Sequence, residues 1–118
     1  MKTYKALTVK QPWAHLIVTG TKTIETRTWT TDYRGLLLIH AGRSFDGGAG
    51  IAPEDLTDRI TFGAIIGHVD LIDIVTEHSS PFFVGPFGWV LANPKRIKPI
   101  PLRGKVRLFD VNLKNVPQ

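Results

Sequence analysis

The feature that most limits how this chain can fold is a series of short β-prone runs separated by turn residues. Gly, Pro or Asp interrupts the chain about every 8–14 residues. The runs between them are 5–10, 23–29, 36–41, 62–75, 87–94 and 104–113. Because strands outnumber helices this heavily, we predict an α+β, mainly β fold: a small β-barrel, not a doubly wound parallel sheet. Closure of the barrel would also hide the edges of the sheet.

The segment QPWAHLIVTG carries the one clear helical pattern, near the N-terminus. Pro12 suits the first helical position, and Gly20 supplies a left-handed stop. Trp13, Leu16 and Ile17 fall on one face. A helix of two turns at most must pack on an apolar surface to persist, so core packing is the ordinary explanation for Trp13.

Length and composition indicate one domain over residues 1–118. The chain has no cysteine, which excludes disulfides, thiol catalysis and thiolate zinc sites. The N-terminus lacks the apolar run of a secretory signal, and no stretch has the ~18 apolar residues of a membrane span. We therefore expect a cytoplasmic protein that does not enter a membrane.

Positive charge gathers at the two ends of the chain. Residues 1–43 carry seven Lys or Arg against two acids, and residues 95–118 carry seven against one. Residues 44–94 carry one Arg against seven acids. If the two ends meet in space, they form one basic surface suited to a polyanion such as RNA. The simpler alternative is that these lysines and arginines only keep the surface soluble.

The stretch TGTKTIETRTW places two cations and a carboxylate beside a tryptophan. In a strand over 23–29, alternation puts Glu25, Arg27 and Trp29 on one face, with Lys22 held by the preceding turn. An ordinary surface ion pair would have this spacing too. Trp29 on the same face favours a partly buried site.

Further candidate ligand-binding residues lie near three other strands. They are Lys10, Gln11 and Trp13 at the start of the helix, His40 and Arg43 at the end of a buried run, and Lys95 and Arg96 in a basic cluster that extends to residue 107. The amide of Gln11 could read the edge of a ligand. The four histidines share no metal-ligand spacing, so neither a metal nor another cofactor is expected.

Longer stretches of the sequence resemble the ASCH domain, a member of the PUA-like superfamily of small β-barrels. The family's run G-x-K-x-x-E-x-R corresponds to Gly20, Lys22, Glu25 and Arg27. The flanking QPW and IHA, and the later GWVLANPKRIKPIPLRGKVRLFDV, extend the resemblance over nearly the whole chain.

The resemblance implies a cleft beside the N-terminal helix, lined by Lys22, Glu25 and Arg27, that binds RNA or a modified nucleotide. It also implies an alternative, a small hydrolase acting on RNA or on N4-acylated cytidine. In that alternative Lys22 is the general base, Glu25 steers it, and Arg27 stabilises the oxyanion. The amidohydrolase subgroup carries a catalytic threonine three residues after its lysine, and Glu25 occupies that position here.

Overall fold

The computed structural model describes residues 1–50 and 60–116, which form six strands and one short α-helix. In chain order the elements are β1 (Lys2–Gln11), α1 (Trp13–Val18), β2 (Ile24–Arg27), β3 (Gly35–Phe45), the 3-10 turn η1 (Gly47–Ala49), β4 (Ala64–Val75), β5 (Phe87–Pro101) and β6 (Leu108–Leu113). The mainly β, α+β class with one N-terminal helix is confirmed. Within the described residues, no helix has the length and apolar character needed to cross a membrane.

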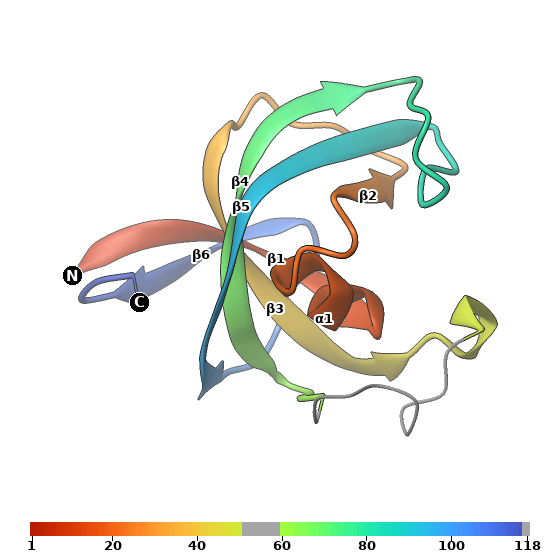
Figure 1. Ribbon diagram of the computed structural model, residues 1–118. Helices are drawn as coiled ribbons and strands as arrows, with labels where there is room; N and C mark the ends of the chain where they lie inside the picture. Colours follow the sequence, from red (N-terminus) through yellow and green to blue (C-terminus); the bar gives the residue numbers. More distant parts are fainter. Residues whose placement is uncertain (51–59, 117–118) are drawn as a thin grey trace.

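All six strands belong to one sheet with the order β2-β5-β4-β3-β1-β6. β1 and β3 are parallel, and every other neighbouring pair is antiparallel. The predicted closure of a barrel is not found, because β2 and β6 end the sheet without pairing with each other. The sheet nevertheless curves strongly, and α1 lies inside the curve (Figure 1).

Alternation along the strands sends side chains to two cores. The inner core lies on the face covered by α1 and includes Leu7, Leu37, Ile39 and the fully buried Trp89. The outer core, on the other parity, consists of Ala6, Leu38, Ile65, Ile97, Phe109 and Val111. Neighbouring residues therefore serve opposite faces of the same strand.

Several strand boundaries differ from the sequence prediction. Residues 95–101 were expected to connect two strands, but they continue β5. Their prolines are tolerated because β2 pairs only with Phe87–Val90, which leaves that edge of β5 free of a ladder partner. β2 is shorter than 23–29 and ends at Arg27, so Trp29 follows the strand. Of the loop expected at 42–53, residues 42–45 belong to β3, and residues 51–53 lie outside the described part.

Candidate functional site

A cavity of about 650 Å³ opens between the two ends of the sheet, and we call it the main cavity. One wall is β2 with the residues after it, Glu25–Trp29, and the opposite wall is Thr8–Lys10 of β1 with residues 105–107 before β6. Trp13 and the end of β3, Gly42–Ser44, complete the lining. Its volume is in the range of about 300–1,000 Å³ that is usual for ligand pockets.

Lys22, Glu25 and Arg27 form one connected ion-pair network. Lys22 Nζ donates to Glu25 Oε1 at 2.6 Å and also to the carbonyl of Ile24. Arg27 donates to Glu25 Oε2 through Nε at 3.0 Å and through Nη2 at 2.7 Å. Lys22 and Glu25 are only 5% and 8% exposed. The network is therefore a partly dry cluster and not a solvated surface pair.

Arg27 also links the two walls of the main cavity. Its Nη2 donates to the carbonyl of Thr8 on β1 at 3.0 Å, although β1 and β2 are not neighbours in the sheet. The side chain thus bridges the gap where a closed barrel would have continued its hydrogen bonds. Arg27 Nη1 donates to no described residue, so one side of the guanidinium is left for a ligand.

A second hollow of about 350 Å³, the side cavity, shares Trp13, Glu25 and Thr26 with the main cavity. Its remaining lining is Lys22, Asp46, Pro81, Phe82 and Val84. Trp13 meets Phe82 edge to face with ring centroids 6.1 Å apart, and Lys22 Nζ lies 5.8 Å from the Trp13 ring centre. The lining of this cavity thus combines apolar and aromatic side chains with the polar ones of Lys22, Glu25, Thr26 and Asp46.

Asp46 fixes the position of the Trp13 indole. Trp13 Nε1 donates to Asp46 Oδ2 at 3.0 Å, and the Gly48 amide donates to Oδ1 at 2.9 Å. These two hydrogen bonds, the one from Trp13 first, lower the pKa of the Asp46 carboxyl below its ordinary value of 3.8. Sequence reasoning did not single out Asp46, because no local pattern indicates that a loop residue would meet a helix more than thirty positions earlier.

Cations dominate the lining of the main cavity. In the described part of the chain, five cations line it, namely Lys10, Arg27, Arg43, Lys105 and Arg107, against one carboxylate, that of Glu25. Among the described residues, only Arg27 of these five takes part in an ion pair. Arg107 instead lies over the Trp29 ring at 5.1 Å, and Trp29 in turn meets Trp89 edge to face at 4.8 Å.

The structure brings most, but not all, of the predicted residues together. Lys22, Glu25, Arg27, Lys10, Trp13, Trp29 and Arg43 line one or both cavities. Lys95 and Arg96 are exposed on β5 and line neither cavity. The basic residues of that segment that do reach the main cavity are Lys105 and Arg107, twelve or fewer positions further along the chain.

Two predicted ligand-binding side chains instead support the backbone. Gln11 is fully buried; its Nε2 donates to the Thr61 carbonyl at 2.7 Å, and its Oε1 accepts from the His15 amide at 2.9 Å. His40 is 2% exposed, with Nε2 placed 2.7 Å from the Leu102 carbonyl and Nδ1 placed 3.1 Å from Thr8 Oγ1. A carbonyl can only accept, so Nε2 carries a proton. Both side chains are occupied by the protein itself.

Within residues 1–50 and 60–116, no cluster of three or more His, Asp or Glu side chains is arranged to hold a metal ion. The described side chains that line the two cavities offer hydrogen-bond donors, positive charge, two carboxylates and aromatic faces.

Comparison with known proteins identifies a matching family model and relatives of this chain. The family model of the ASCH domain matches residues 7–101. Human activating signal cointegrator 1 is 28% identical over an alignment of 129 positions that covers 92% of this chain and 22% of that protein. The mouse protein of the same name is 26% identical with the same coverage. The chain thus spans about a fifth of the length of these relatives.

Solved structures share the fold. The crystal structure of ASCH from Zymomonas mobilis superposes with a TM-score of 0.60 at 18% identity, covering 84% of this chain and 73% of that one. A mutant form of the same protein gives a TM-score of 0.58 at 19% identity, covering 84% and 76%. At these identities the likeness concerns the course of the backbone alone.

Proposed function

The chain belongs to the ASCH domain family, and on that premise we propose that it binds RNA or a modified nucleotide in the main cavity and the adjoining side cavity. The family is associated with RNA binding. The single observation that carries the proposal is the convergence of five cations on one hollow, where the one carboxylate among the described lining residues, Glu25, is already paired with Lys22 and Arg27. Such a surplus of positive charge is suited to phosphate.

The ion-pair network supplies the polar groups that would orient a base. Arg27 lines the main cavity, and its Nη1, which donates to no described residue, would serve as a donor for a carbonyl or phosphate oxygen. Glu25 Oε1 accepts one hydrogen bond, from Lys22, and a carboxylate oxygen has room for a second. In the proposed complex, Glu25 accepts from an exocyclic amine, as carboxylates do with the amino group of cytosine.

Aromatic side chains supply the surfaces on which a base would stack. Trp13 lines both cavities, Trp29 lines the main one, and Phe82 lines the side cavity. Stacking on an aromatic side chain contributes about 1–3 kcal/mol per base. Trp89, fully buried beneath Trp29, holds that ring in place and belongs to the core.

The hydrogen bonds of Lys22 favour binding over hydrolysis. Lys22 Nζ donates to both a carboxylate and a carbonyl and is 5% exposed, as expected of a group that holds the site together. As the general base of the hydrolase alternative, Nζ would instead have to accept a proton. Binding requires no change in these hydrogen bonds.

Titration of the intrinsic tryptophan fluorescence with single-stranded RNA tests the proposal, since Trp13 and Trp29 line the site. We expect saturable binding that weakens steeply as salt is raised, because bound phosphates release counterions. Arg27→Ala removes a charge-assisted donor and should weaken binding about tenfold or more. Arg34→Ala is the matched control, because Arg34 is exposed outside both cavities and should leave the affinity within about twofold.

Two outcomes would contradict the proposal. If no salt-sensitive fluorescence change occurs at protein and RNA concentrations of tens of micromolar, the proposal that the protein binds RNA is wrong. Release of product from N4-acetylcytidine or from small RNAs, abolished by Lys22→Ala, would replace binding with hydrolysis.

A further inference from the structure

We propose that the main cavity recognises a terminal phosphate or polyphosphate, the chemistry of a free nucleotide or of a phosphorylated RNA end, in preference to the phosphodiesters inside a strand. The inference rests on the proposed function, because it assumes that the cavity holds a nucleotide. The inference specifies the part of the nucleotide that the cations contact, namely its terminal phosphate group.

The balance of charge is the first argument. Among the residues that the structure describes, five cations and one carboxylate line the main cavity, and the carboxylate is shared between Lys22 and Arg27. A phosphodiester brings a single negative charge, which leaves most of these cations uncompensated. A terminal phosphate carries about −1.5 to −2 near neutral pH, and a polyphosphate carries more. Only the multiply charged group matches the charge that the cavity presents.

The direction of approach is the second argument. The cations come from separate parts of the fold: Lys10 from β1, Arg27 from β2, Arg43 from β3, and Lys105 and Arg107 from the segment before β6. They surround one hollow instead of following one face of a strand. A terminal phosphate has three free oxygens that can be met from several sides, whereas an internal phosphodiester has two and continues as chain in both directions.

The conformation of Arg107 is the third argument. Its φ of 58° lies in the left-handed region, which side-chain-bearing residues seldom adopt. Its guanidinium is held over the Trp29 ring at the lining of the cavity. Unfavourable backbone conformations persist where the surrounding structure holds them, and they are enriched at functional sites. Here the strained backbone and the ring together hold a cation that no described carboxylate pairs with.

Calorimetric titration with a matched series of ligands tests the inference. The series consists of the nucleosides, their 5′-mono-, di- and triphosphates, and one oligoribonucleotide prepared with a 5′-hydroxyl, a 5′-monophosphate or a 5′-triphosphate. We expect affinity to rise about tenfold from nucleoside to monophosphate and again on adding further phosphates. The three oligonucleotides report whether an RNA end is accepted, and the free nucleotides report whether a mononucleotide suffices.

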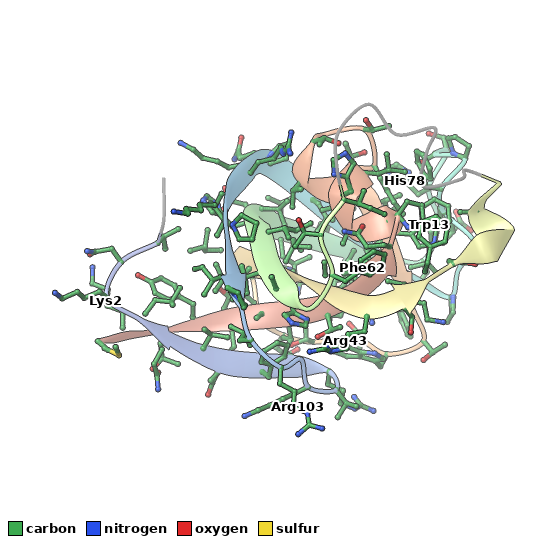
Figure 2. The ribbon with its side chains drawn as sticks, turned by 90° about the horizontal axis from the view of Figure 1, so that it is seen from below. Lys2, Trp13, Arg43, Phe62, His78 and Arg103 are labelled. Carbon is green, nitrogen blue, oxygen red and sulfur yellow. The ribbon has the colours of Figure 1, made fainter. Side chains whose placement is uncertain are left out.

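Charge-reversal variants distinguish phosphate binding in the main cavity from attraction by the overall positive charge of the protein. Lys105→Glu changes a cation of the main cavity, whereas Lys2→Glu makes the same change in net charge at the opposite end of the molecule from Trp13 (Figure 2). Both residues are exposed, so both variants should fold. We expect Lys105→Glu to lower triphosphate affinity about tenfold or more and Lys2→Glu to lower it about twofold or less.

The outcomes distinguish this inference from the proposed function. Equal affinity for the 5′-hydroxyl and 5′-phosphorylated oligonucleotides, with Lys105→Glu weakening both alike, would overturn the terminal-phosphate inference and leave RNA binding intact. Equal effects of Lys105→Glu and Lys2→Glu on triphosphate affinity would also overturn it. Failure of every nucleotide and oligonucleotide to bind would overturn the proposed function itself.

Discussion

Glu25 is the residue on which the charge balance of the site depends. It joins Lys22 and Arg27, and its side chain is 11% exposed while that of Lys22 is 5% exposed. Removing the Glu25 carboxylate would therefore leave the Lys22 ammonium unpaired where water solvates it poorly. The pair between Lys5 and Asp110 has a similar N···O distance, 2.7 Å against 2.6 Å for Lys22 and Glu25, but its side chains are 42% and 58% exposed.

We predict that Glu25→Ala destabilises the protein by about 3–5 kcal/mol, because it leaves the buried Lys22 ammonium without a carboxylate. Asp110→Ala should lower stability by about 1 kcal/mol or less, since exposed pairs contribute little. Urea unfolding of both variants measures the difference. Replacing both buried partners, as Lys22→Met with Glu25→Leu, should recover much of the loss; equal losses for Glu25→Ala and Asp110→Ala would show that burial does not matter here.

Asp46 predicts an acid dependence of stability. Hydrogen bonds from Trp13 and Gly48 hold the pKa of Asp46 below its ordinary value of 3.8. A carboxyl whose pKa is lowered on folding stabilises the folded state above the ordinary pKa, and this contribution is lost as the pH falls through the lowered pKa. We therefore expect Asp46→Asn to lose less stability than the parent protein on acidification.

Unfolding by urea at a series of acidic pH values checks this prediction. Trp13→Phe is the second variant, because it removes the stronger donor and keeps an aromatic ring. It should flatten the same part of the pH profile, though less than Asp46→Asn does. Parallel profiles for all three proteins would show that the two hydrogen bonds have no such effect.

At the scale of elements, α1 and β2 owe their positions to close packing more than to their own length. α1 has six residues and β2 has four, too few for either to persist alone. Because Gly67 on β4 has no side chain, both Val18 of α1 and the Lys95 carbonyl of β5 can lie close to its Cα. A Cβ built there would lie 2.3 Å from the Lys95 carbonyl oxygen and 2.7 Å from Val18 Cγ1.

We predict that Gly67→Ala destabilises the protein by about 3 kcal/mol, the upper end of the range for overpacked cores, because a backbone carbonyl cannot move aside easily. Gly47→Ala is the matched control, since nothing lies within 4 Å of its added Cβ and it should change stability by less than about 0.5 kcal/mol. Thermal unfolding of the two variants is the measurement. A Gly67→Ala protein as stable as Gly47→Ala would mean that α1 shifts at no cost.

For the molecule as a whole, the open sheet and the main cavity are one feature. β2 ends one side of the sheet and β1 and β6 the other, and the cavity occupies the gap between them. Continuous strand pairing would have filled this gap with backbone hydrogen bonds. Arg27, reaching from β2 to the Thr8 carbonyl, replaces that pairing with one side chain and leaves space for a ligand.

The two cores should unfold together, because consecutive residues of each central strand serve opposite faces. All three tryptophans belong to or pack against the inner core, so their fluorescence reports that face alone. We predict that Phe109→Ala, in the outer core, lowers stability by about 3–5 kcal/mol and shifts the fluorescence midpoint equally. A fluorescence midpoint that stays in place while far-UV circular dichroism is lost would show two independent units.

How much of this molecule follows from its sequence depends on the range of the interaction concerned. Turn residues, β-prone runs and the pattern around Trp13 act within a few positions, and they indicated five or six strands, of which the structure has six, together with one short helix and the mainly β class. The G-x-K-x-x-E-x-R run also lies within eight residues, so local spacing was enough to bring Lys22, Glu25 and Arg27 together as candidates.

Only the tertiary structure decided which polar residues face the cavities and which support the backbone. Gln11 and His40 had the chemistry of ligand-binding residues, but backbone carbonyls at residues 61 and 102 occupy them. Lys105 and Arg107, and not Lys95 and Arg96, reach the main cavity because β5 continues through its prolines before the chain turns back. The reason is physical: sequence patterns report contacts between near neighbours along the chain, whereas the gap in the sheet arises from pairings between strands far apart in it.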